Sequence, residues 1–138
     1  MRIMAIDYGD AHTGIAISDP TGFMTGYATV ITAYRPEVVV QRIAELAKEY
    51  GVEELVLGHP INMDGTRGPR SEKAQAMKAL LEETLPLPVT LWDERRTTID
   101  AHQILFNSGK NAKKRKKVVD AVAASLILEG YLTFKKSK

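Results

Sequence analysis

The sequence changes its pattern at Pro36, and this change constrains the fold more than any other single feature. Before Pro36, short apolar runs separated by turn residues predict strands over residues 2–8, 15–18 and 24–32. After Pro36, helical and strand-like patterns alternate. Strands joined by short turns run antiparallel, whereas a strand that follows a crossover helix returns parallel to its predecessor. The sequence therefore predicts a mixed sheet, in which three antiparallel strands are followed by two parallel ones.

Local signals place the elements that follow Pro36. Proline suits the first turn of a helix and glycine ends one, so the first helix is expected to begin at Pro36 and stop at Gly51. Ser71 is predicted to cap the second helix. The other expected elements are strands over 55–58 and 89–92, a loop over 61–70, helices over 71–84, 97–107 and 118–132, and a basic loop or helix start over 109–117. This order predicts an α/β fold with a five-stranded mixed sheet flanked by helices, in one domain spanning residues 1–138.

Composition excludes several classes of protein. The chain has 138 residues, of which 44% are hydrophobic and 26% charged, as is typical of a soluble globular domain. It has no cysteine, which excludes disulfides, thiolate nucleophiles and cysteine-based zinc sites. No apolar run approaches the roughly 20 residues that span a bilayer, and the N-terminus lacks the layout of a signal peptide. We therefore expect neither a membrane anchor nor an exported protein.

Carboxylates stand at the ends of two predicted strands and inside an apolar helix. Asp7 ends the first strand, and Asp93 and Glu94 follow the fifth. Asp120 lies in VVDAVAASLIL (118–128), where nine of eleven residues are apolar. An isolated ionised carboxylate is costly in such a setting, so a partner is expected for Asp120.

The predicted topology brings these carboxylates to one edge of the sheet. Parallel strands one and five place Asp7 and the Asp93-Glu94 pair at the edge where α/β sheets usually bind ligands, and a helix packed across the sheet can add Asp120. Clustered carboxylates repel one another unless cations lie between them. Mg²⁺ or Mn²⁺ prefer oxygen ligands, and two such ions about 3.5–4 Å apart can promote phosphodiester cleavage. The pattern therefore favours a divalent-metal site.

Other interpretations of the same residues stay open. Asp7 can form a salt bridge with Arg95 or Arg96, Asp120 can cap the last helix, and the carboxylates after strand five can lie on the surface. The turn DYGDAHTG (7–14) also resembles the phosphate-binding turn of actin-like ATPases and sugar kinases. Those proteins need a second domain of similar fold, and this chain has neither the length nor the internal repeat for one.

Cationic residues indicate a polyanionic partner. The run KNAKKRKK (110–117) holds six cations in eight residues, and a phosphate backbone would relieve their mutual repulsion. His12 and His59 are more simply explained as a turn residue and a loop residue. The residues expected to contact phosphates are Arg67, Arg70, Lys113, Lys114 and Arg115.

Four segments together resemble the YqgF family across nearly the whole chain: IDYGDAHTGIAISD, VLGHPINMDGTRGPRS, WDERRTT and DAVAASLILEGYL. Members of that family are described as nucleases of pre-16S rRNA processing and as Holliday-junction resolvases. The resemblance implies an RNase H-like fold, a divalent-metal nuclease activity, a cytoplasmic bacterial protein and a role in ribosome maturation.

The resemblance also assigns roles to residues. By position, Asp7, Glu94 and Asp120 would hold the metal ions, and Arg95 would contact an acid or a phosphate. Glu94 is preferred to Asp93 because adjacent strand residues point to opposite faces.

We accordingly expect a nuclease that hydrolyses phosphodiester bonds of structured nucleic acid, with RNA favoured by the resemblance alone. The expected role is 5′-end processing of pre-16S rRNA, by a monomer or weak homodimer. A resolvase of branched DNA is an alternative, and it would demand a dimer with two sites. A third possibility is an RNA-binding module of this fold that does not cut. The chain departs from the family pattern at Ala11-His12, where basic residues are usual, and at His59, where leucine is common.

Overall fold

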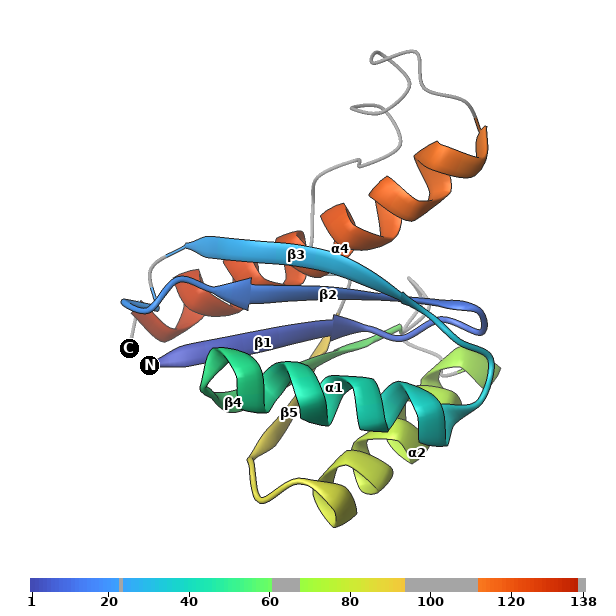
Figure 1. Ribbon diagram of the computed structural model, residues 1–138, viewed down its shortest axis with the longest axis horizontal. Coiled ribbons are helices and arrows are strands. Elements are labelled where there is room, and N and C mark those ends of the chain that lie inside the picture. The colour runs from blue at the N-terminus through green and yellow to red at the C-terminus, as the bar shows by residue number, and fades with distance from the viewer. Residues whose placement is uncertain (23, 61–67, 94–111, 137–138) are drawn as a thin grey trace.

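The computed structural model describes residues 1–22, 24–60, 68–93 and 112–136, with residues 112–120 described only as part of a helix. These residues form a central sheet with helices on both faces (Figure 1). Among them, no helix is long and apolar enough to cross a membrane.

The sheet in this part of the chain is mixed. Its strands are β1 (Arg2–Asp7), β2 (His12–Ser18), β3 (Thr25–Thr32), β4 (Val52–His59) and β5 (Val89–Asp93). They lie in the order β3-β2-β1-β4-β5. β2 is antiparallel to both β1 and β3, whereas β4 is parallel to β1 and β5 is parallel to β4. The predicted fold class, three antiparallel strands followed by two parallel ones, is confirmed.

Helices pack on both sides of the sheet. The described helices are α1 (Pro36–Tyr50), α2 (Pro69–Thr84) and α4 (Ala112–Lys136). On one face, Ile6 of β1 and Ile43 of α1 belong to the same buried cluster. On the other face, where α4 runs, Ala5 of β1 is buried with Ile127 of α4. The central strands are therefore covered on both faces, as parallel strands usually are.

The first helix has the bounds that the sequence predicted. Pro36 occupies its first turn, where a missing N–H costs nothing. Gly51 follows its last residue in the left-handed conformation, with φ 67°, and its N–H donates to the carbonyl of Ala47. A residue with a Cβ is strained in that conformation, so glycine is the natural stop.

Several other boundaries differ from the prediction, among them those of β4, which spans Val52–His59 instead of residues 55–58. Helix α2 begins at Pro69, with Gly68 as its N-cap, so Ser71 is not the cap and Arg70 is helical rather than in a loop. Proline fixes a helical φ at the first position, which moves the start two residues earlier. Strand β2 begins at His12 instead of residue 15, and α4 already begins at Ala112, so most of the basic run is helical. The helix predicted over 97–107 lies outside the described residues.

Candidate active site

Asp7 ends β1 on the face of the sheet that α4 covers. Ile6 is buried against α1 and α2, whereas Ile3 and Ala5 are buried under α4. Because strand residues alternate between faces, Asp7 shares the face of Ile3 and Ala5. Asp7 is half-buried, and its register partner on β2 is Gly14, which has no side chain. The predicted catalytic aspartate therefore stands at the carboxyl end of a central strand, on the side of α4.

The end of β5 shows the same alternation. Trp92 is buried under α4, while Leu91 packs with the cluster on the opposite face. Asp93 follows Leu91 onto the α1–α2 face, beside its register partner His59 on β4. Asp93 and Asp7 therefore lie on opposite faces of the sheet. The next residue, Glu94, lies outside the described residues, so its role as the ligand stays a prediction.

Asp120 lies inside helix α4, which begins at Ala112 and has no acidic residue in its first turn. The interpretation of Asp120 as a helix cap is therefore wrong, since capping and dipole effects are confined to the first turn. Ala124 and Ile127 of the same helix are buried against the sheet. Asp120 precedes Ala124 by four residues, or about one helical turn.

Most of the predicted site lies where the structure makes no statement about side chains. This group comprises Arg67, Glu94, Arg95, Lys113, Lys114, Arg115 and Asp120. The described side chains contain no group of three that could hold a metal ion. Since two of the three predicted ligands are not among those side chains, the metal site stays a prediction.

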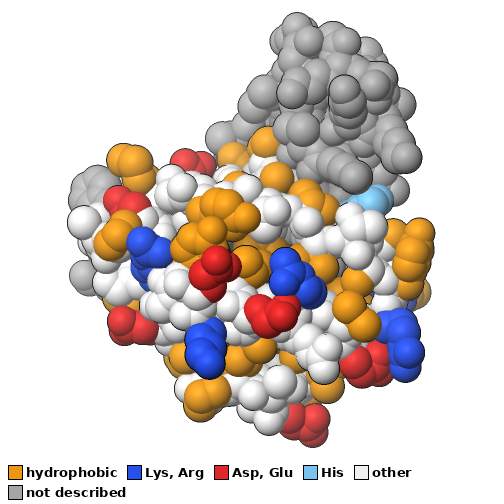
Figure 2. Space-filling model, viewed as in Figure 1, with side chains coloured by type: hydrophobic (Ala, Val, Ile, Leu, Met, Phe, Trp, Pro, Cys, Tyr) orange, Lys and Arg blue, Asp and Glu red, His pale blue; other side chains and the backbone are white. Residues whose placement is uncertain are grey.

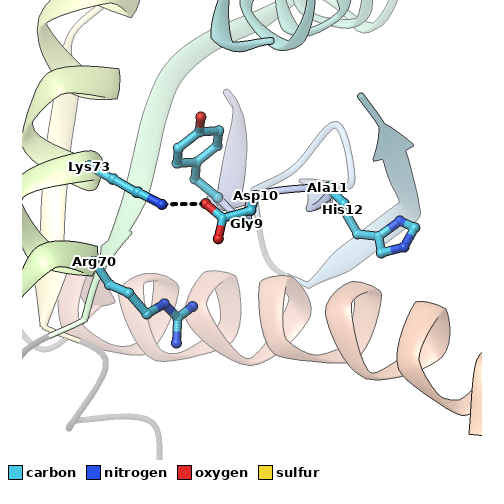
Figure 3. A pocket seen from close by; sticks show the side chains of 7 residues that line it. Gly9, Asp10, Ala11, His12, Arg70 and Lys73 are labelled. Atoms are coloured by element: carbon cyan, nitrogen blue, oxygen red, sulfur yellow. Dashed lines mark hydrogen bonds and ion pairs between the residues drawn. The ribbon is translucent and has the colours of Figure 1, made fainter. Parts of the chain in front are cut away.

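A pocket of about 250 Å³ opens at the turn between β1 and β2, directly after Asp7. Arg70 and Lys73 extend from α2 toward this turn, and the Lys73 ammonium lies 2.6 Å from the Asp10 carboxylate (Figure 3). The hydrogen bond and charge of Lys73, with a smaller contribution from Arg70, hold the pKa of Asp10 below its usual value. The pocket is lined by Tyr8, Gly9, Asp10, Ala11, His12, Arg70 and Lys73.

The turn itself depends on Gly9. A Cβ at this position would stand 2.4 Å from the carbonyl oxygen of His12, which is closer than atoms can approach. Gly9 thus allows the bend from β1 into β2. His12 is not a turn residue but the first residue of β2, half-buried, with Nδ1 3.3 Å from the Thr32 hydroxyl.

A buried polar contact ties β4 to the first turn of α2. His59 is the last residue of β4 rather than a loop residue, and it is only 6% exposed. Its Nε2 lies 2.6 Å from the Ser71 hydroxyl, which also accepts a hydrogen bond from Gln75. Ser71 is completely buried. This contact fixes the start of α2 against the sheet, and with it the helix turn that carries Arg70 and Lys73.

Sequence reasoning missed Asp10, Lys73 and the contact between His59 and Ser71. Lys73 could have been found from its spacing, because it follows Arg70 by three residues and so lies on the same face of a helix. The helical spacing was overlooked because Arg70 was expected to lie in a loop. The contact between His59 and Ser71 joins a strand to the following helix, and no local pattern indicates it.

Comparison with known proteins identifies the family. The family model described as "RuvX: Holliday junction resolvase" matches residues 1–134. The chain belongs to this family. It is 46% identical to the "Putative pre-16S rRNA nuclease" of Halothermothrix orenii over 134 residues, which cover 97% of this chain and 96% of that protein. It is 43% identical to the protein of the same name from Bacillus subtilis, over 96% of this chain and 97% of that protein.

The fold agrees with membership of the RuvX family. The chain superposes on Thermus thermophilus RuvC, solved in complex with a Holliday junction substrate, with a TM-score of 0.64. The match covers 98% of this chain and 96% of RuvC at 14% identity, so it supports the RNase H-like fold. The resemblance found in the sequence is thereby confirmed, and with it the assignment to a family of nucleases.

Proposed function

We propose that this protein is a divalent-metal nuclease that processes the 5′ end of pre-16S rRNA. The observation that carries the proposal is the position of Asp7, a half-buried carboxylate at the carboxyl end of β1 on the face covered by α4. This is the edge of an α/β sheet where ligands bind. The RNA substrate is proposed because relatives at 43–46% identity carry the name of a pre-16S rRNA nuclease.

In this proposal Asp7, Glu94 and Asp120 hold Mg²⁺ or Mn²⁺. Carboxylate oxygens are the ligands that these ions prefer, and the β2 register partner of Asp7 is Gly14, which has no side chain. Asp93 is a poor candidate because the alternation of β5 directs it to the opposite face. Bound ions would supply the Lewis acidity that activates water and stabilises charge on the phosphate.

The protein's own residues would hold the substrate backbone. Arg70 points toward the turn that follows Asp7, which suits a contact with a phosphate near the cut. Further phosphate contacts are proposed for Arg67, Arg95, Lys113, Lys114 and Arg115. The face formed by α1 and α2 mixes acidic and basic side chains (Figure 2), a distribution that does not favour a polyanion there. Nucleic acid would accordingly approach the strand-end edge.

A second candidate is the resolution of branched DNA. It is favoured by the family description, Holliday junction resolvase, and by the fold shared with RuvC. A resolvase would need two copies of the site on one junction. We propose a monomer or weak homodimer and RNA as substrate, and the following experiment separates the two activities.

The test is a cleavage assay with Mn²⁺ on two labelled substrates, a pre-16S rRNA 5′ fragment and a four-way DNA junction. The variants are Asp7→Asn and the matched control Glu53→Gln, an exposed carboxylate near the amino end of β4. We expect wild type and Glu53→Gln to cut the RNA, and Asp7→Asn to lose at least about 100-fold in rate. Cutting of the junction alone would replace the RNA role with resolution. Tight RNA binding without any cutting would indicate the non-catalytic module.

A further inference from the structure

The pocket at the β1–β2 turn holds an ion pair that another anion can replace. The Lys73 ammonium and the Asp10 carboxylate are 2.6 Å apart, yet their side chains are 53% and 79% exposed. An exposed pair is weak, because water solvates both charges and salt screens them. The Asp10 carboxylate thus stands where a phosphate oxygen would stand, on a cation that it holds only loosely.

The remaining lining favours a phosphate. Arg70 comes from the same helix face as Lys73, so the pocket presents two cations against one carboxylate. Guanidinium and ammonium groups are the common phosphate ligands of proteins.

Size and position restrict the ligand further. A volume of about 250 Å³ lies below the range of about 300–1,000 Å³ that is typical of pockets for drug-sized ligands, so it suits a small group such as one phosphate. The first lining residue, Tyr8, directly follows Asp7 in the chain, so the pocket lies at the same end of the sheet as the proposed metal site.

We propose that Arg70 and Lys73 form a subsite for a backbone phosphate next to the scissile one. In the free protein the Asp10 carboxylate pairs with the Lys73 ammonium, and a phosphate of the nucleic acid displaces this carboxylate on binding. This inference rests on the proposed nuclease function for the identity of the ligand. Asp10 then acts as a selectivity residue. Its carboxylate competes with a single weakly held phosphate, whereas a correctly placed polyanion, held at several points, displaces it.

The proposal predicts an unusual direction of change. Removing most charged residues from a nucleic-acid site weakens binding, but Asp10→Asn should tighten it, because it frees Lys73 and removes a repulsive charge. Lys73→Gln should weaken binding about threefold and reduce the slope of log affinity against log salt by about 0.7 for a single strand. The gain from Asp10→Asn should shrink when Lys73→Gln is also present.

The experiment measures fluorescence anisotropy of a labelled single-stranded RNA oligonucleotide in EDTA, so that no cleavage occurs. Helix α2 offers a matched control, since Lys78 pairs with Glu82 at 3.7 Å and neither residue lines the pocket. Glu82→Gln frees Lys78 just as Asp10→Asn frees Lys73. We expect Asp10→Asn to tighten binding about 3-fold to 10-fold and Glu82→Gln to leave it unchanged.

Two results would overturn the subsite: no gain with Asp10→Asn, or an equal gain with Glu82→Gln. If Asp10→Asn tightens RNA binding just as much when Lys73→Gln is also present, Lys73 does not contact the phosphate and this part of the proposal is wrong. The cleavage assay with Mn²⁺ separates this failure from failure of the nuclease function. If the wild type cuts RNA but substitutions at Asp10 and Lys73 do not change RNA binding, only the subsite is refuted. The expected binding changes without cutting refute only the nuclease, and a wild type that binds no RNA refutes both.

Discussion

Two lysine–carboxylate ion pairs in this protein have nearly the same N–O distance, but one carboxylate is buried and the other is exposed to solvent. The Lys135 ammonium lies 2.7 Å from Glu54, and the Lys73 ammonium lies 2.6 Å from Asp10. The Glu54 side chain is 10% exposed, whereas that of Asp10 is 79% exposed. Burial removes the competition of water from the first pair and leaves it in the second. Distance alone therefore does not tell a structural ion pair from an exchangeable one.

The two pairs also stand at opposite ends of the sheet. Glu54, near the start of β4, accepts hydrogen bonds from both Tyr131 and Lys135, which lie one turn apart near the end of α4. The ring of Tyr131 packs edge-on against Trp92, with centroids 5.6 Å apart. The hydrogen bonds to Glu54 fasten the C-terminal part of α4 to the amino end of β4. The carboxyl end, with Asp7 and the pocket, carries the exchangeable pair and the proposed chemistry.

The largest effect on stability is expected from Glu54→Gln. The substitution leaves Lys135 without its buried counter-charge, and breaking a buried pair costs several kcal/mol when both partners are fully buried. Lys135 is 39% exposed, so we expect a loss of about 2 kcal/mol. Urea unfolding measures this loss. Glu53→Gln, the exposed neighbour on the same strand, should leave stability unchanged, and equal losses in the two variants would contradict the comparison.

A smaller effect, which depends on pH, is expected from Tyr131→Phe. The pKa of Tyr131 is raised above its ordinary value of 10.0, mainly by burial and to a smaller extent by the hydrogen bond to Glu54. The folded protein therefore holds this proton more tightly than the unfolded chain does. The corresponding stability is complete below about pH 10 and is lost as the pH rises through the folded-state pKa.

Loss of the hydroxyl should cost about 1–2 kcal/mol near pH 7. Unfolding curves near pH 8 and pH 10.5 should show the gap between wild type and Tyr131→Phe closing at the higher pH. A gap that widens at alkaline pH would contradict the assigned direction of the pKa shift.

The smallest effect on stability is expected from Asp10→Asn, because that pair is exposed. Its melting temperature near pH 7 should match that of wild type, while its affinity for RNA rises. The pKa of Asp10 is lowered by Lys73, so any stability from this pair is present above the ordinary aspartate pKa and is lost as the pH falls. A clear drop in melting temperature near pH 7 would make this pair structural, and the contrast with Glu54 would fail.

The fold could be predicted from the sequence where local signals decided the structure. Pro36 and Gly51 set both ends of α1, because one residue type fits each position. The directions of the strands followed from turn lengths and crossover helices. The start of α2 was misjudged because two local signals competed, and Pro69 prevailed over Ser71.

The site could be predicted only in part, for a different reason. The preference for Glu94 over Asp93 came from the period of two in a strand. The face on which Asp7 lies depends on which helices cover each side of the sheet, and the uniformly apolar run of β1 does not record that. The contacts of Ser71 with His59 and of Lys73 with Asp10 join different elements. They depend on how α2 packs against the sheet, and no periodicity records that packing.

The central claim is that Asp7, Glu94 and Asp120 share divalent ions while Asp93 does not. A Mn²⁺ titration followed by electron paramagnetic resonance tests it without any substrate. We expect Asp7→Asn, Glu94→Gln and Asp120→Asn each to weaken Mn²⁺ binding at least about 10-fold, the lower end of what loss of a metal-site group costs. Asp93→Asn should change binding less than about 2-fold, because Asp93 faces away from Asp7. Weakened binding in Asp93→Asn together with unchanged binding in Glu94→Gln or Asp7→Asn would contradict the account.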